Sequence, residues 1–319
     1  MYWYIKYPLL MLLGALLATV GWWALHRVGT RQGGAATPPP AAAQVQGARP
    51  PAPPVATPPA VAPAEAARQA ALERLARQLA AAEGFLGQGQ WLQARAAATA
   101  VLAAPEVTAY DPFWHRAAGI LTRANLSLFN SDLPMPEKIR ITVKSGDTLI
   151  GLARRHQTTV AALERQNKLD TARTTIYPGM VLHVMPPQFA ITVLKNRFVL
   201  LLHNGEALFA YWRVGIGRQN RTPVGSFVVN SRLQEPVWTP PGQVIPYGDP
   251  RNVLGTHWLG LAPAAGTDPA LKGFGIHGTW EPDSIGTAAS EGCVRMRNAD
   301  IAALFAMIPN GTPVTIRDE

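Results

Sequence analysis

The chain has 319 residues, of which 48% are hydrophobic, and it contains 29 prolines, 28 glycines and a single cysteine. One cysteine excludes an intrachain disulfide and a Cys/His zinc site. The net charge of +9 is spread along the chain and forms no basic cluster, so the composition indicates no nucleic-acid partner.

The N-terminal region predicts a membrane anchor followed by a linker. Residues 7–25 form an uncharged, mostly apolar run with basic residues on both sides. As a helix this run would be roughly 28 Å long, close to the hydrocarbon thickness of a bilayer. We expect a retained transmembrane anchor at 1–28, and a cleaved signal peptide is the alternative. The proline- and alanine-rich stretch 29–64 predicts an extended linker without a core.

Residues 65–131 predict a small helical segment. Leucines recur there at helical spacing within an Ala/Arg/Glu-rich sequence, at Leu72, Leu75 and Leu79. Further helices are expected over 91–103 and 112–129, with Asp111 as the cap of the last one. A single Gly-Gln-Trp-x-x-Ala unit resembles a tetratricopeptide repeat. We interpret the segment as a spacer or small bundle, with partner binding as the alternative.

Residues 139–186 predict a compact strand–helix–helix–strand module. Alternating apolar residues predict the first strand, and a Pro-Gly turn precedes the closing one. Either Asp147 or Thr148 can cap the first helix. Either Thr158 or Thr159 can cap the second.

This module closely resembles a LysM domain, the matching stretches being 143–149, 163–169 and 178–182. The resemblance implies binding of glycan strands that contain N-acetylglucosamine, in a groove beside residues 146–148 and 176–178. Gly151 departs from the pattern because glycine weakens a helix. A module kept only as a spacer is the alternative.

Short strands rich in β-branched residues predict a mainly-β domain over 189–319. Gly215 and Gly217, followed by another glycine at 225, superficially fit a phosphate-binding loop. A strand follows them where such a loop needs a helix, so we interpret them as turn glycines. His257 and Trp258 are expected to be structural or to line a pocket.

Cys293 and His277 are the candidate catalytic pair of this domain. A neighbouring histidine can take the proton of a thiol and generate the thiolate nucleophile. Gly292 allows close approach of substrate to the backbone, whose amides can point at a developing oxyanion. Arg295 would share the strand face of Cys293 and can hold a substrate carboxylate. The alternative for a lone cysteine is a small buried core residue.

The sequences at 277–279 and 290–295, with flanking stretches across 189–319, closely resemble the signature of L,D-transpeptidases of the YkuD family. Glu291 departs from it, since many members have a second histidine there. The resemblance implies a set of site residues: catalytic Cys293 as nucleophile, His277 as base, Gly278 as the carbonyl that orients the imidazole and Ser290 as loop support, with Arg295, Trp280 and Gly292 at the substrate.

The family's reaction is acyl transfer on peptidoglycan stem tetrapeptides, without metal or cofactor. D-Alanine leaves, and the acyl group passes to an amine of another stem peptide or of a lysine in a wall-anchored protein. Carbapenem sensitivity is also implied. The alternatives are an L,D-carboxypeptidase, with water as acceptor, and a non-catalytic LysM scaffold that binds the wall.

These expectations combine into a multidomain fold class. The chain would have an N-terminal transmembrane helix, a Pro/Ala linker, a small α-helical segment, a βααβ LysM module and a mainly-β YkuD-type catalytic domain. We expect a single-pass protein of the inner (cytoplasmic) membrane, with the catalytic domain in the periplasm and a role in cell wall biogenesis and cell shape.

Overall fold

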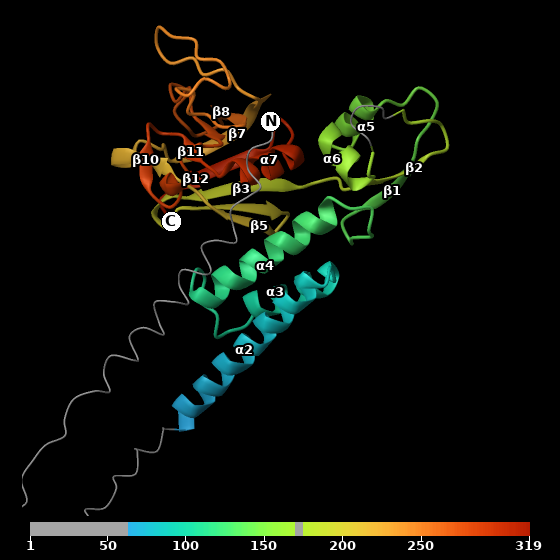
Figure 1. Cartoon of the computed structure of the whole chain (residues 1–319), viewed down its shortest axis with the longest axis vertical. Helices are drawn as coiled ribbons and strands as arrows, with labels where there is room; N and C mark the ends of the chain where they lie inside the picture. The colour runs from blue at the N-terminus through green and yellow to red at the C-terminus, as the bar shows by residue number, and fades with distance from the viewer. Residues whose placement is uncertain (1–62, 170–174) are drawn as a thin grey trace, which may run out of the picture. The chain divides into compact units, whose positions relative to one another are not determined.

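The computed structural model describes residues 63–169 and 175–319 (Figure 1). The expected anchor at 1–28 lies outside these residues, as does the expected linker at 29–64 apart from its last two residues. Among the residues described, no helix is both long and apolar enough to cross a membrane.

Three helices form the first part of the described chain: α2 (Pro63–Gly87), α3 (Trp91–Leu102) and α4 (Pro112–Phe129). They pack around a core of their own, which includes Leu75, Leu79, Ala94, Ala98 and Leu121. Asp111 caps α4 as expected, because its carboxylate accepts a hydrogen bond from the Trp114 amide at 2.7 Å. The leucine spacing in the sequence therefore marks the buried face of α2.

Helix α4 also packs against the β-rich domain, alongside strand β5 (Ala207–Arg213) in Figure 1. The Asn125 side chain donates a hydrogen bond to the Phe209 carbonyl at 2.8 Å. The rings of Phe129 and Phe209 meet edge to face, with centroids 6.4 Å apart. The helical segment thus contacts the β-rich domain directly.

The βααβ module consists of β1 (Ile139–Thr142), α5 (Leu149–Arg155), α6 (Val160–Gln166) and β2 (Val181–Val184). Strands β1 and β2 pair antiparallel. The helices and strands enclose a separate small core, which includes Val143, Leu152, Leu163 and Leu182.

The two open capping alternatives are resolved by side-chain hydrogen bonds. Thr148 caps α5 by accepting from the Gly151 amide at 3.0 Å, and Thr159 caps α6 by accepting from the Ala162 amide at 2.9 Å. A Cβ added at Gly151 would lie 3.1 Å from the Thr148 hydroxyl oxygen. The glycine that weakens α5 therefore also leaves room for its cap.

The β-rich domain is built on an eight-stranded sheet of order β11-β9-β8-β7-β12-β3-β4-β5. Its other strands are β3 (Phe189–Leu194), β4 (Val199–Asn204), β7 (Gly225–Gln234), β8 (His257–Pro263), β9 (Gly275–His277), β11 (Val294–Arg295) and β12 (Pro313–Arg317). Most pairs are antiparallel, but β11 pairs parallel with β9 and β12 with β3. Helix α7 (Asn298–Met307) buries Ile301 and Leu304 in the core of this domain.

The interpretation of Gly215 and Gly217 as turn glycines is wrong. Gly215 forms a β-bridge with Arg295, and Gly217 ends β6 (Ile216–Gly217), which pairs with β10 (Ala288–Ser290). A Cβ on Gly217 would lie only 2.8 Å from the Cα of Gly292. These glycines are needed because two backbones approach closely there, which no local sequence pattern distinguishes from a turn.

Candidate active site

The predicted nucleophile and base lie on the two strands at one edge of the sheet. Strand β11 pairs in register with β9, so that Arg295 is opposite His277. Cys293 directly precedes β11, and the Gly275 amide of β9 hydrogen-bonds to its thiol. Because side chains alternate along a strand, Cys293 and Arg295 lie on the same face as His277. The pairing thus brings together three of the predicted site residues.

His277 is buried, with 3% of its surface exposed. Its Nδ1 lies 2.5 Å from the carbonyl oxygen of Gly278, which can only accept, so Nδ1 bears the proton and Nε2 keeps the lone pair. Burial lowers the pKa of His277 to about 4; the Gly278 carbonyl opposes this shift and the charge of Arg295 adds to it. The imidazole is therefore a neutral base at neutral pH.

Trp258 on β8 holds the ring of His277 in place. The two residues are opposite each other in the sheet, and their rings stack with centroids 5.8 Å apart and planes 20° apart. Space for the indole comes from two glycines, because a Cβ on Gly275 would lie 2.6 Å from its ring and one on Gly260 2.9 Å from its Nε1. From the sequence, Trp258 is expected only to line a pocket or to belong to the core. Its contact with His277 depends on the register of β8 with β9, which the local sequence does not show.

Hydrogen bonds of two buried hydroxyls fix the loop that carries Cys293. The hydroxyl of Ser290 donates to the Cys293 carbonyl at 2.6 Å and accepts from the Gly292 amide at 3.1 Å. The hydroxyl of Thr222 donates to the Gly292 carbonyl at 2.9 Å and accepts from the Gly217 amide at 2.7 Å. Sequence reasoning assigned loop support to Ser290 but gave no role to Thr222.

Gly292 itself is in a conformation that favours glycine. Its φ is +136°, and a Cβ at this position would lie 2.8 Å from the ring of Phe274. A side chain here would therefore strain the backbone and displace the loop. The expectation of close backbone approach at Gly292 agrees with this geometry.

The thiol of Cys293 is neutral at rest. Burial raises its pKa above the usual value, while the Gly275 amide and the charge of Arg295 act in the opposite direction. Its Sγ lies 3.9 Å from the Gly273 carbonyl oxygen. With the pKa of the thiol raised and that of His277 lowered, the two groups form a neutral pair and not a thiolate–imidazolium ion pair at neutral pH.

Arg295 already contacts a carboxylate of its own chain. Its Nη1 lies 2.7 Å from Oε2 of Glu281. The Arg295 side chain is 11% exposed and its Nε has no partner among residues 63–169 and 175–319, whereas the Glu281 side chain is 66% exposed. Trp280, beside Glu281, is exposed and lies 6.2 Å from the ring of Tyr247. Sequence reasoning missed Glu281, because nothing in the local sequence indicates its pairing with Arg295.

Glu291, which departs from the expected signature, forms ion pairs with Arg218 and Arg221. These arginines belong to or flank the short helix η2 (Arg218–Asn220), so Glu291 ties η2 to the cysteine loop. His257, by contrast, contacts the hydroxyl of Thr256 at 2.9 Å. Within 63–169 and 175–319, no group of three or more His, Cys, Asp or Glu side chains is placed to hold a metal ion.

Comparison with known proteins gives matches over both modules. Residues 187–316 match the family model of the L,D-transpeptidase catalytic domain (YkuD), and residues 141–184 match that of the LysM domain. The putative L,D-transpeptidase YkuD of Bacillus subtilis is 32% identical over 181 residues, which cover 54% of this chain and 96% of that protein. The putative L,D-transpeptidase YqjB of the same organism is 34% identical over 134 residues, covering 42% of this chain and 72% of the relative.

Among solved structures, the catalytic domain of an L,D-transpeptidase from E. faecium covers 41% of this chain and 98% of its own, at 21% identity. Its TM-score is 0.32. That score is too low to add to the family assignment, which therefore depends on the sequence matches.

Proposed function

The chain belongs to the YkuD family of L,D-transpeptidases and carries a LysM domain, and we propose that Cys293 and His277 perform its acyl transfer on peptidoglycan stem tetrapeptides. The observation that carries this assignment is the pairing of β9 with β11, in which Arg295 lies opposite His277 and the Cys293 thiol meets the Gly275 amide. The hydrogen bond from Nδ1 of His277 to the Gly278 carbonyl supports it, because it leaves Nε2 free to accept a proton.

In the first half-reaction, the sulfur of Cys293 attacks the carbonyl carbon of the third stem residue while Nε2 of His277 takes the thiol proton. The carbonyl π electrons move to oxygen, where backbone amides of the cysteine loop stabilise the charge. Collapse of this intermediate breaks the peptide bond. The leaving amine of D-alanine takes the proton from His277, and a thioester remains on Cys293.

In the second half-reaction, an acceptor amine attacks the thioester carbonyl. His277 removes a proton from this amine and returns it to the departing thiolate of Cys293. The products are a new amide bond and the original neutral pair. Because both groups are neutral at rest, proton transfer accompanies sulfur attack in this scheme and does not precede it.

Arg295 supports this scheme as the group that holds the carboxylate of the donor peptide. It is the only cation on the same strand face as Cys293 among the β9 and β11 residues, and its guanidinium is mostly buried. Its present partner, Glu281, is largely exposed, so water can solvate the Glu281 carboxylate when a substrate carboxylate replaces it. The donor carboxylate would therefore take the position that the Glu281 carboxylate has here.

The cellular setting is part of the same proposal. The apolar run at 7–25 supports a single-pass anchor in the cytoplasmic membrane, and a wall substrate would require the catalytic domain on its periplasmic side. The LysM domain would bind glycan strands beside residues 146–148 and 176–178. A lysine of a wall-anchored protein is the second type of acceptor, next to the amine of another stem peptide.

Incubation of the full chain with a soluble stem tetrapeptide, followed by mass analysis of the products, tests this function. We expect free D-alanine and a cross-linked dimer. A tripeptide without any dimer would identify water as the acceptor and the protein as a carboxypeptidase. Absence of every product would contradict the enzymatic proposal.

A further inference from the structure

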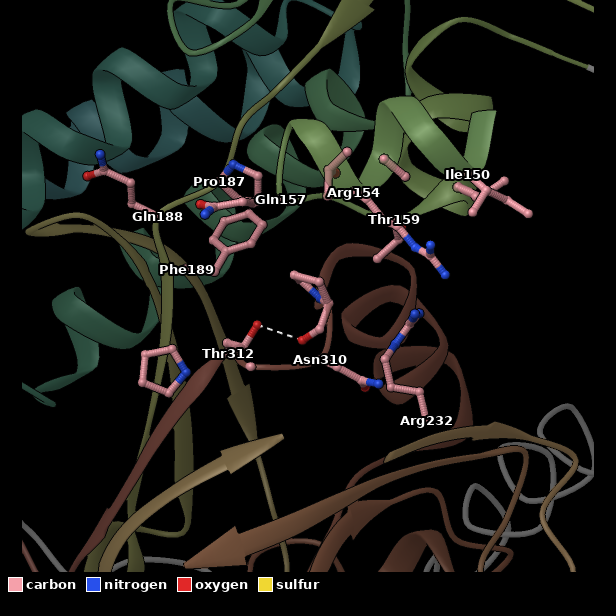
Figure 2. A pocket seen from close by; sticks show the side chains of 16 residues that line it. Ile150, Arg154, Gln157, Thr159, Pro187, Gln188, Phe189, Arg232, Asn310 and Thr312 are labelled. Atoms are coloured by element: carbon pink, nitrogen blue, oxygen red, sulfur yellow. Dashed lines mark hydrogen bonds between the residues drawn. The ribbon is translucent and has the colours of Figure 1, made fainter. Parts of the chain in front are cut away.

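A cleft of about 730 Å³ lies between the LysM domain and the catalytic domain (Figure 2). Helix α5 and the α5–α6 connection form one wall, and residues 187–189, Arg232 on β7 and the 309–313 segment form the other. The volume falls within the range of small-ligand pockets, roughly 300–1,000 Å³. No residue assigned above to the active site or to the expected glycan groove lines this cleft.

Both walls of the cleft are fixed by contacts within the fold. The hydroxyl of Thr159, which caps α6, also hydrogen-bonds to the Ala306 carbonyl of α7. Ala162 of α6 is fully buried in the same core cluster as the sheet of the catalytic domain. In the opposite wall, the Thr312 hydroxyl donates to the Pro309 carbonyl at 2.8 Å, as the dashed line in Figure 2 shows. The cleft is therefore part of the packed structure.

The charge of the cleft is one-sided, because the described residues that line it include two arginines and no carboxylate. Arg154 is exposed on α5, and Arg232 on β7 is half-buried. Arg232 donates to the Phe305 carbonyl at 2.6 Å and stacks over that ring at 4.2 Å, but its Nε has no acceptor in the part of the chain that the structure describes. Within the described ranges, neither arginine has an acidic partner. A partly buried cation without a counter-charge is costly, so the cleft favours an anion.

Amide side chains provide the remaining polar contacts of the cleft. Gln157 and Asn310 are exposed on opposite walls, and Gln188 is exposed at the edge of the cleft near Pro187 (Figure 2). Primary amides both donate and accept hydrogen bonds, which suits the peptide group. Guanidinium groups suit carboxylates. Cations and amides together match a short peptide with free carboxylates better than a neutral sugar chain.

We propose that this cleft binds a carboxylate-bearing stem peptide of the peptidoglycan strand, separately from the donor peptide at Cys293. The inference deepens the proposed function, because it gives the wall polymer a third point of contact besides the LysM groove and the active site. A stem peptide in the cleft would contact both domains at once. It would thereby fix the strand relative to the catalytic domain.

Binding of the full chain to two forms of cell wall tests this proposal: intact sacculi, and sacculi from which an amidase has removed the stem peptides. Arg154→Glu and Asn310→Asp each add a carboxylate to one wall of the cleft. We expect Arg154→Glu to weaken co-sedimentation with intact sacculi roughly five- to tenfold and Asn310→Asp to act in the same direction, with binding to the stripped glycan unchanged. Arg140→Glu, a surface change on β1 of the same module, is the matched control.

Three results would overturn the inference. If Arg154→Glu and Asn310→Asp weaken binding to intact and to stripped sacculi equally, the cleft binds the glycan and not the stem peptide. Unchanged binding to both would show that the cleft takes no part, and an equal loss in Arg140→Glu would reduce the effect to general surface charge. D-Alanine release from soluble tetrapeptide by the unaltered chain is measured in parallel, so that failure of the proposed function is seen separately.

Discussion

The LysM domain and the catalytic domain differ in how they hold their buried polar groups. In the LysM domain, the side chain of Asp147 is 8% exposed, but its carboxylate accepts from the Lys144 amide at 2.8 Å and pairs with the exposed Arg155. In the catalytic domain, His277 and Ser290 are each only 3% exposed. Burial changes the protonation of the catalytic groups, whereas hydrogen bonds from the Lys144 amide and from Arg155 lower the pKa of Asp147 and keep it charged. Substitutions should therefore alter reactivity in the catalytic domain and mainly local stability or wall binding in the LysM domain.

His277→Gln should show the largest effect. Loss of the general base should lower kcat/KM for D-alanine release roughly 10³-fold. The unfolded imidazole binds a proton near pH 6.5, but the folded one does so only near pH 4, so protonation favours unfolding between these values. Stability of the unaltered chain should fall as the pH drops from 6.5 to 4, and this dependence should weaken in the variant. Activity reduced less than tenfold would remove His277 from the mechanism.

The reactivity of Cys293 toward a neutral alkylating reagent should follow its raised pKa. The fraction of thiolate, and with it the alkylation rate, should rise about tenfold per pH unit from pH 7 through pH 9. A resting thiolate–imidazolium pair would instead give a rate that is constant from pH 6 to 8. Mass spectrometry of the labelled chain measures the rate directly, because Cys293 is its single cysteine.

The buried hydroxyl of Ser290 and the exposed helix cap Thr148 allow a comparison of how much each contributes to the free energy of unfolding. Ser290→Ala removes two hydrogen bonds of the buried cysteine loop and should cost about 1–3 kcal/mol of unfolding free energy, together with activity. Thr148→Ala removes only the cap of α5 and should cost about 1 kcal/mol or less. Its D-alanine release from soluble tetrapeptide should be unchanged. Denaturant unfolding measures the loss of unfolding free energy in both variants. A larger loss in Thr148→Ala than in Ser290→Ala would contradict this prediction.

Glu281→Gln should have the smallest effect on activity, and it should improve substrate binding. Without the Glu281 carboxylate, Arg295 no longer has to exchange partners when the donor peptide binds. Because Glu281 is largely exposed, the gain should be modest, with KM for the tetrapeptide falling roughly two- to fivefold and kcat changing little. Asp283→Asn, which removes a nearby charge that does not pair with Arg295, is the control. An increased KM in Glu281→Gln would show that Glu281 helps to bind the substrate.

Local sequence was sufficient for the features that depend on local structure. Helical leucine spacing identified α2, and short polar side chains before apolar runs identified the cap at Asp111. For α5 and α6 they left two candidates each, of which the structure has Thr148 and Thr159. The roles of Cys293 and His277 as nucleophile and base came from the family resemblance, because a cysteine and a histidine sixteen residues apart indicate little by themselves.

Non-local features could not be predicted in this way. The stacking of Trp258 on His277 depends on the register of β8 with β9, and the close approach of Gly217 to Gly292 depends on how β6 crosses the cysteine loop. Register is set by the packing of the whole sheet and not by propensity. The pairing of Glu281 with Arg295 and the cleft between the two domains likewise arise only after folding.

Detection of the acyl-enzyme addresses the assignment of Cys293 directly. The full chain is mixed with soluble stem tetrapeptide in the absence of other acceptors, quenched in acid and digested for mass analysis. We expect the peptide containing Cys293 to gain the mass of the tetrapeptide minus D-alanine, and Cys293→Ala to give neither adduct nor D-alanine. D-Alanine release that persists in Cys293→Ala, or an adduct on any other residue, would contradict this account.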